Sequence, residues 1–412
     1  MLHRWKPGYS ASVQPRLKDV AALAGVSIKT VSNVVNGYPF VKPETRERVE
    51  RAIAELNYRP NLTARNLRQG RSGVIALAVP DLDIPYFAEL ATNVITAADR
   101  HGWTVLIDQT QGDRAKERLV VSGIRAHLID GLLFSPLALT AADLAQRADH
   151  TPMVLLGERI GRRRTAYDHV CIDNVAAAEE ATSHLTGLGR RRIAAIGARQ
   201  AASGATARLR LRGYRQALAA AGLAEDPALV VPVDAFHRAD GARAMADLLD
   251  SGAGPDAVFC FNDTLALGAL RTLLSRGVRV PDDIALFGFD DIEDGRFSTP
   301  SLSTIAPDRA GIAQTAVDLL AGLLAGPAPD RRPQEVCASH TLIARESTLG
   351  VQAQSAAGSS STERTVASAA PSSGPRLPSS DTVSASGSHS RTVTRAASSR
   401  RIGGTSHSPS SA

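Results

Sequence analysis

Cysteine is scarce in this chain of 412 residues, and long apolar runs are absent from it. The cysteines Cys171, Cys260 and Cys337 lie far apart in apolar, strand-like runs, so we expect three reduced thiols in the core. No run of about 18 apolar residues occurs, which argues against a membrane span. The N-terminus has no apolar segment typical of a secretory signal. These absences predict a cytoplasmic protein without a membrane partner.

Motifs of the common enzyme classes are also missing. The lysines, none of which follows a glycine-rich phosphate loop, are Lys6, Lys18, Lys29, Lys42 and Lys116. There is no H-E-x-x-H motif, no Cys/His cluster at zinc spacing and no G-x-S-x-G nucleophile elbow. We therefore predict that the protein is not an enzyme and that it has no cofactor and no metal site.

Charge is distributed unevenly along the chain, although the net charge is only +6. Residues 1–70 contain 12 Lys and Arg against 5 Asp and Glu, and residues 351–412 contain 6 against 2. The segment between them is therefore acidic. A basic N-terminal segment on an acidic body indicates an anionic polymer such as nucleic acid as its partner.

Residues 15–60, which follow a flexible arm over 1–14, predict three short helices around a small core. The first has an apolar face at helical spacing and ends at Gly25. Ser27 can cap the second, over 28–35, and Asn36-Gly37 can end it. The third follows Pro43. The expected core side chains are Leu17, Val20, Ala21, Ala24, Val49, Ile53 and Leu56.

Residues 72–350 alternate apolar strand-length runs, such as "GVIALAVP" and "DIALFGFDD", with helical stretches such as "DTLALGALRTLLSRG". This alternation predicts parallel α/β sheets covered by helices on both faces. The strand–helix units are too many for one small sheet, so we expect two lobes. Ligands bind at the carboxyl ends of such strands. Residues 351–412 contain 19 Ser and no aromatic residue, so we expect a disordered tail.

Several motifs occur along the chain in the same order as in a known protein family. "RLKDVAALAGVSIKTVSNVVNG", "NYRPNLTARNLRQGRSGVIALAVPDL", "FCFNDTLALGALRTLLSRGVRVPDDIALFGFDD" and "TPSLSTI" resemble the LacI/GalR family of bacterial transcriptional repressors over residues 16–350. The resemblance implies a helix-turn-helix head, a hinge helix over 61–71 and a two-lobed core similar to periplasmic sugar-binding proteins. It also implies a homodimer on a pseudo-palindromic, double-stranded DNA operator and a small effector in the cleft.

The second helix of the head is the expected DNA reader, because the N-terminal residues of a recognition helix meet base edges in the major groove. Lys29 can donate to guanine or to a phosphate, Asn33 can pair with adenine, and Ile28 can touch a thymine methyl. The alternatives are that Ile28 packs, that Lys29 meets only phosphate and that Asn33 is merely exposed. Further expected phosphate or hinge contacts are Ser27, Thr30, Ser32, Asn36, Tyr38, Asn61 and Arg65.

Leu67 falls where the resemblance implies a leucine that wedges into the central base step of the operator. An apolar wedge in the minor groove unstacks that step and bends the duplex. The alternative is that Leu67 packs against its own domain. Tyr38 can likewise be a packing residue instead of a phosphate contact.

The resemblance places effector contacts at Phe87, Arg210, Asn262 and Asp290, and strand-end position adds Ser135 and Glu158. A carboxylate, an amide, a guanidinium and an apolar face together suit a sugar or sugar derivative. Asn262 can instead cap a helix, as we expect for Asp263 and Asp291, and Arg210 can be paired structurally. Pro307 stands where a lactose-responsive member of the family has a polar residue that contacts the ligand. Proline offers no hydrogen-bond donor there, which predicts an effector other than a simple galactoside.

Two alternative functions stay open at this point. A purine or nucleoside effector suits the aromatic pair Tyr86-Phe87 within the same class of regulator. A solute-binding protein of a transporter has the same expected core fold, but the basic head and the missing signal argue against it. The tail has no leucine heptad, so we expect a dimer that acts in the cytoplasm at the nucleoid.

Overall fold

The computed structural model describes residues 15–35, 38–58, 71–123, 128–158, 160, 166–199, 204–326 and 331–350, and the backbone of the short strand at 365–366. The described helices and strands all lie between Leu17 and Val366. The candidates that lie outside the described residues are Asn36, Asn61, Arg65 and Leu67. The expected arm over 1–14 also lies outside them.

The head is a bundle of three short helices, α1 (Leu17–Ala24), α2 (Ile28–Val35) and α3 (Pro43–Glu55). One apolar side chain from each helix, Val20, Val31 and Val49, is fully buried in the common core. Gly25 ends α1 with a φ of 61°, a conformation that glycine adopts without a steric penalty. The three predicted helices are confirmed, with the difference that Pro43 is the first residue of α3 instead of the residue before it.

The N lobe, as we name it, is built on a parallel sheet with the strand order β11-β5-β4-β3-β1-β2. Side chains alternate between its two faces: Ile75 and Leu77 contact α5 and α13, and Ala76 and Ala78 lie on the α6 and α7 side. Its elements are β1 (Val74–Val79), α5 (Pro85–Asp99), β2 (Thr104–Gln109), α6 (Arg114–Val121), β3 (Gly131–Phe134), α7 (Ala141–Ala145), β4 (Met153–Leu156), β5 (Asp168–Ile172), α13 (Arg309–Leu324) and β11 (Glu335–Ala338).

The C lobe is built on a second sheet with the order β13-β12-β10-β9-β8-β6-β7. Helices α8 and α9 cover one face, and α10 and α11 cover the other. Its elements are α8 (Asn174–Gly187), β6 (Ile193–Ala198), α9 (Ala205–Ala220), a 3-10 turn η1 (Pro227–Leu229), β7 (Val230–Pro232), α10 (Arg238–Asp250), β8 (Ala257–Cys260), α11 (Asp263–Ser275), β9 (Ala285–Phe289), α12 (Glu293–Phe297), β10 (Ser303–Pro307), β12 (His340–Ile343), α14 (Glu346–Leu349) and β13 (Thr365–Val366). The other strands of this sheet are parallel, as predicted, while β12 runs antiparallel to its neighbours β10 and β13.

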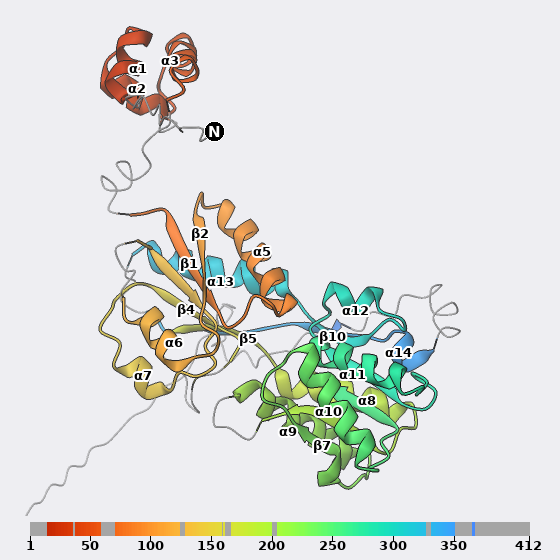
Figure 1. Cartoon of the computed structure of the whole chain (residues 1–412). Coiled ribbons are helices and arrows are strands. Elements are labelled where there is room, and N and C mark those ends of the chain that lie inside the picture. The colour runs from red at the N-terminus through yellow and green to blue at the C-terminus, as the bar shows by residue number, and fades with distance from the viewer. Residues whose placement is uncertain are drawn as a thin grey trace, which may run out of the picture. The chain divides into compact units, whose positions relative to one another are not determined.

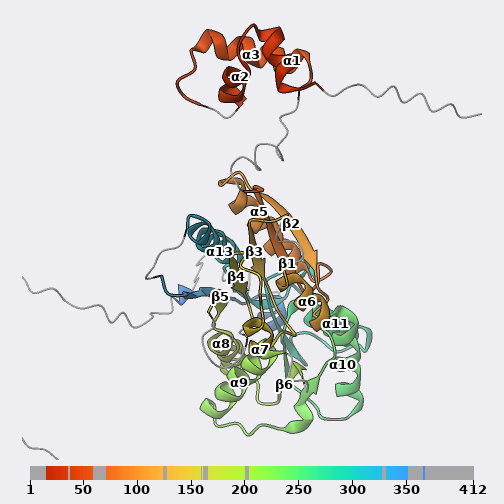
Figure 2. The same ribbon diagram turned by 90° about the vertical axis from the view of Figure 1, so that its left-hand side faces the viewer.

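The chain crosses between the lobes after β5, after β10 and after β11. Helix α13, late in the sequence, therefore packs on α5 in the N lobe, as its blue colour among orange and yellow elements shows (Figure 1). The view turned by 90° likewise places α13 beside the N-lobe strands (Figure 2). Among the described residues, none of the helices is long and apolar enough to cross a membrane.

The three cysteines occupy different environments. Cys260 is buried on β8, Cys171 on β5 is half-buried, and Cys337 on β11 is exposed. The expectation of three core thiols is wrong for Cys337. The physical reason is that β11 is the edge strand of the N-lobe sheet, so a side chain on it is covered from one side only.

Candidate functional site

Helix α2 presents the first two of its residues to solvent. Val31 and Val34 are buried against the rest of the head, whereas Ile28 is 54% exposed and Lys29 is also exposed. The packing alternative for Ile28 is therefore wrong within the head. An exposed apolar side chain beside a lysine at a helix N-terminus is suited to contact both a base methyl group and a phosphate or base edge.

The N-terminus of α2 is fixed by Ser27. Its hydroxyl oxygen accepts a hydrogen bond from the Thr30 backbone N–H at 3.1 Å, and the two hydroxyl groups lie 2.9 Å apart. The predicted cap is thus confirmed. Ser32 and Asn33 are half-buried on the same helix, so the groups that could reach a duplex are held in a defined orientation.

Tyr38 follows α2 and is half-exposed. Its backbone N–H donates to the Asn33 carbonyl at 2.9 Å, and its own carbonyl accepts from Arg46 at 2.8 Å. The ring lies edge-on to Phe40, with 5.5 Å between ring centroids. These contacts hold the segment after α2 and leave the phenol end at the surface of the head.

A cavity of about 210 Å³ lies between the N and C lobes, at the carboxyl ends of their strands. Both lobes contribute to its wall, with residues that follow β1, β3 and β4 on one side and β8 and β9 on the other. The effector contacts predicted from the sequence all line this cavity; they are Phe87, Ser135, Glu158, Arg210, Asn262 and Asp290.

Arg210 on α9 is the central cation of the cavity. It is only 8% exposed, and its guanidinium donates to Asn174 Oδ1 at 2.9 Å and to the Phe261 carbonyl. The group lies 3.4 Å from the centroid of the Phe289 ring and 4.0 Å from Asp290. Burial lowers the pKa of Arg210. The chain thus pairs and orients this cation in the wall of the cavity.

Asp290 follows β9 and is the anion of the cavity. Its φ of 116° lies in a region that non-glycine residues rarely adopt, and strain of this kind is often found at functional sites. The backbone is fixed there because its N–H donates to the Ile305 carbonyl at 2.8 Å and its carbonyl accepts from Arg309. Burial raises the pKa of Asp290 to about 7, although Arg210 opposes that change. The side chain is suited to accept hydrogen bonds from effector hydroxyl groups.

An aromatic corner forms the N-lobe side of the cavity. Tyr86 and Phe87, in the first turn of α5, meet edge to face with 5.2 Å between ring centroids. Burial raises the pKa of Tyr86 to about 12, with the Asp290 carboxylate acting in the same direction. The corner offers an apolar face and a neutral phenol hydroxyl to a bound molecule.

Asn262 lines the cavity but is also the N-cap of α11. Its Oδ1 accepts from the Leu265 N–H at 2.9 Å, and its Nδ2 donates to the Phe236 carbonyl at 3.1 Å and to Thr264 at 2.7 Å. The capping alternative therefore describes its present contacts. An effector would meet an amide whose two N–H groups already have partners.

Glu158 joins the two lobes. Its carboxylate, at the end of β4 in the N lobe, accepts from the N–H groups of Ala205 at 3.0 Å and Thr206 at 3.2 Å in the first turn of α9. The N-cap residue of that helix is Gly204, which has no side chain, so Glu158 supplies the cap from the opposite lobe. Burial raises the pKa of Glu158. An effector that displaced this carboxylate would release the contact between the lobes.

Several further polar residues line the cavity that sequence patterns did not single out, among them Arg199, His237 and Asn174. His237 lies 3.2 Å from the carboxylate of Asp81 across the cleft, and thus forms a second polar link between the lobes. The sequence signal for His237 is weak, because it lies in an irregular segment before α10 and outside any strand end.

Two carboxylates beside the cavity have a role different from the helix caps that we expected. Asp291 pairs with Arg345 at 2.6 Å and with Arg296 at 2.5 Å. Asp263, the first residue of α11, accepts from Thr304 Oγ1 at 2.7 Å and from the Ile292 N–H at 3.0 Å. Both tie β9 and β10 to neighbouring segments, so they stabilise the wall of the cavity.

These features define a regulator with a helix-turn-helix head and an effector domain like that of periplasmic binding proteins. Family models agree: residues 16–61 match bacterial regulatory proteins, lacI family, and residues 182–348 match the periplasmic binding protein-like domain.

Curated relatives cover most of the chain. The HTH-type transcriptional repressor CytR of Escherichia coli (strain K12) is 35% identical over 311 residues, which are 75% of this chain and 90% of CytR. The ribose operon repressor of Haemophilus influenzae is 33% identical over 336 residues, 80% of this chain and 98% of that repressor. The chain therefore belongs to the lacI family of bacterial regulatory proteins: it is a DNA-binding transcriptional repressor with an effector-binding domain, and not an enzyme.

Solved structures give the same result. A putative transcriptional regulator of the LacI family from Sanguibacter keddieii is 48% identical, with a TM-score of 0.62 over 68% of this chain and 99% of that one. The complex of the regulator CelR with cellobiose is 33% identical, with a TM-score of 0.60 over 81% and 99%. A lac repressor dimer bound to operator and an anti-inducer is 30% identical, with a TM-score of 0.70 over 81% and 99%.

Proposed function

We propose that this repressor binds a pseudo-palindromic operator as a homodimer and that a sugar or sugar derivative in the interlobe cavity controls it. The head over 15–60 reads the DNA, the segment over 61–71 is the hinge, and residues 72–350 bind the effector and dimerise. The protein acts in the cytoplasm, where it has access to the chromosome. The lac repressor dimer on its operator supports this assembly by similarity.

The observation that carries the effector class is the set of groups around the cavity. A buried carboxylate, Asp290, and an oriented guanidinium, Arg210, lie opposite the aromatic corner of Tyr86 and Phe87. Polyols require such a combination, because their hydroxyl groups both donate and accept while their C–H faces lie against rings. CelR with cellobiose is a structural relative with a sugar ligand.

A purine or nucleoside effector is the second candidate. The observation in its favour is the same aromatic corner, since a planar base can stack on an aromatic ring. PurR of Haemophilus influenzae (strain PittEE) is 35% identical over 306 residues, 74% of this chain and 89% of PurR. The carboxylate of Asp290 can also accept a hydrogen bond from a base edge.

A thermal-shift panel of sugars, sugar phosphates, nucleobases and nucleosides distinguishes the two candidates. A ligand that binds only the native state raises the melting temperature. At a ligand concentration of 100 times its Kd, the free energy of unfolding rises by about 2.7 kcal/mol. A rise with a sugar supports the first proposal, and a rise with a nucleobase or nucleoside supports the second. No rise with any compound of either class would overturn both.

Asn33→Ala is expected to weaken operator binding at one base pair in each half-site. The loss should be about 1–3 kcal/mol for the preferred base and close to zero for the other bases, because an amide that pairs with a base edge discriminates between bases. The measurement is the affinity for a set of operators that differ at single positions, selected from a random library at a stated salt concentration. Arg48→Ala on α3 is the control, and an equal loss at every position for Asn33→Ala would refute base reading by this residue.

Leu67→Ala is expected to lower operator affinity more than tenfold and to leave the thermal shift by an active compound unchanged. The reason is that an apolar wedge in the minor groove is needed to unstack and bend the central step. Circular-permutation gel shifts measure the bend. A bend of the same angle with wild-type and variant protein would exclude a wedge at this position.

A further inference from the structure

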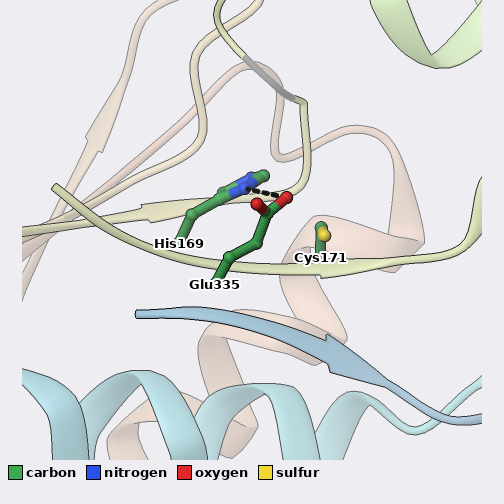
Figure 3. A group of neighbouring side chains, drawn as sticks. All are labelled: His169, Cys171 and Glu335. Carbon is green, nitrogen blue, oxygen red and sulfur yellow. Dashed lines mark ion pairs between the residues drawn. The ribbon is translucent and has the colours of Figure 1, made fainter. Parts of the chain in front are cut away.

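A second group of polar side chains lies at the edge of the N-lobe sheet and has no part in the proposed effector contacts. His169 and Cys171 alternate along β5, and Glu335 is on the neighbouring strand β11 (Figure 3). One ring nitrogen of His169, the Cys171 sulfur and one Glu335 oxygen lie within 4.8 Å of one another. Nitrogen, sulfur and carboxylate oxygen are the donors that bind Zn²⁺ in proteins.

The pairing of the two strands explains why these donors meet. In the parallel ladder, Glu335 is the partner of His169 and Cys337 is the partner of Cys171. Partners in neighbouring strands point to the same face, so all four side chains share one face of the sheet. Their neighbours Val170 and Val336 belong to the opposite face, in the core that contains α13.

The orientation of His169 is that of a metal ligand. Its Nε2 lies 3.1 Å from the Gly157 carbonyl, which only accepts, so this nitrogen carries a hydrogen. Nδ1 lies 3.9 Å from Glu335 Oε1, where a protonated ring forms an ion pair with the carboxylate and where a bound cation could take the place of that proton. Metal-binding histidines almost always donate their other ring N–H to a carbonyl or carboxylate in this way.

The 3.9 Å separation also fits one ion between the two groups. Zinc binds nitrogen at about 2.0–2.1 Å and carboxylate oxygen at about 2.0–2.2 Å, so two such ligands at a tetrahedral angle lie roughly 3.4 Å apart. Small side-chain rotations would close the remaining distance. The exposed edge at Cys337 gives a path from solvent, and His169 itself is buried.

We propose that His169, Cys171 and Glu335 form a binding site for a divalent cation of the zinc class, beside Cys337 and next to the effector cavity, whose wall includes Cys171. Its thiolate, neutral imidazole and carboxylate favour Zn²⁺ over Mg²⁺ or Ca²⁺, which prefer oxygen ligands alone. The sequence showed no zinc motif because β5 and β11 come from distant parts of the chain, so the donors lack any short spacing. The site would tie the edge strand β11 to β5 and fix the Gly157 turn beside Glu158.

The test is a titration of the full chain, purified without a histidine tag, stripped with chelator and kept reduced. Co²⁺ should give one thiolate-to-cobalt absorption band per chain, and Zn²⁺ should abolish it stoichiometrically. Cys171→Ser should remove the band. His169→Asn and Glu335→Gln should each lower zinc affinity by at least about 10-fold to 100-fold, the cost of losing even an outer-shell partner.

Cys260→Ala is the matched control, because this thiol is buried on β8 of the other lobe and should leave the cobalt band unchanged. Circular dichroism of each variant confirms that it is folded. No band with the wild-type chain, or a band of equal intensity in Cys171→Ser, would overturn the proposal. Equal zinc affinity of wild type and His169→Asn would do the same.

Discussion

Replacing Gly268 by alanine is expected to lower the free energy of unfolding by about 3 kcal/mol. Gly268 lies on α11 where that helix crosses α10, and a Cβ atom there would come within 1.9 Å of the Arg238 carbonyl oxygen. In the reverse direction, a Cβ at Gly241 on α10 would come within 2.1 Å of the Leu265 carbonyl oxygen. Since both obstacles are backbone atoms, the helices must move apart, and the buried contacts between them are lost.

The measurement is the melting temperature of the core, which should fall by roughly 5–10 °C. Gly322→Ala is the matched control, because Gly322 lies on α13 with open space around its Cβ position. This control should gain about 0.5–1 kcal/mol, since alanine has a higher helix propensity than glycine. If Gly268→Ala melted no lower than Gly322→Ala, the close approach of α10 and α11 would not limit stability.

Much of the fold could be predicted from local sequence patterns. Continuous apolar runs such as Val74–Val79 and Ala285–Phe289 are buried on both faces, and this pattern distinguished them from the polar helices between them. The short strands β7 and β12 are not among the predicted runs. Most of their positions are half-buried or exposed, so they lack the continuous apolar run that the prediction needs.

The topology of the lobes depended on contacts that no local pattern encodes. Helix α13 follows β10 of the C lobe yet packs in the N lobe, because the chain crosses back between them. The register of β11 on β5 has the same origin, and it brings His169 and Glu335 together from positions far apart in sequence. Residues that follow strand ends, such as Ser135 and Asp290, could be placed in the cavity because strand direction alone determines that edge.

The role of a cavity residue was harder to predict than its position. Glu158 was expected as an effector contact from its place after β4, and it does line the cavity. Its carboxylate nevertheless binds the first turn of α9 in the other lobe, a contact that depends on the distance between the lobes. The half-exposed His237, which meets Asp81 across the cleft, had only a weak sequence signal, because it lies outside any strand end.

Asp290→Asn is expected to change how stability depends on pH in the protein without effector. Burial raises the folded-state pKa of Asp290 to about 7, above its value of about 4 in the unfolded chain. The folded state therefore holds the proton more tightly, and the free energy of unfolding falls as pH rises from about 4 to about 7. Asparagine has a similar shape and no charge, so the variant should be more stable than wild type by about 4 kcal/mol above pH 7 and equal to it near pH 4.

Asp250→Asn on α10 is the control for the direction in which an Asp-to-Asn change shifts stability above pH 4. A hydrogen bond from Arg276 lowers the pKa of Asp250, so its ionised form stabilises the folded state and this control should lose stability above pH 4. Asp290→Asn should also weaken sugar binding, because one acceptor oxygen becomes a donor. An active sugar should then be needed at about 10-fold to 100-fold higher concentration to give the same thermal shift. Greater stability with intact binding would place the effector elsewhere in the cavity. Lower stability above pH 7 would instead mean that the ion pair with Arg210 outweighs the cost of burying the carboxylate.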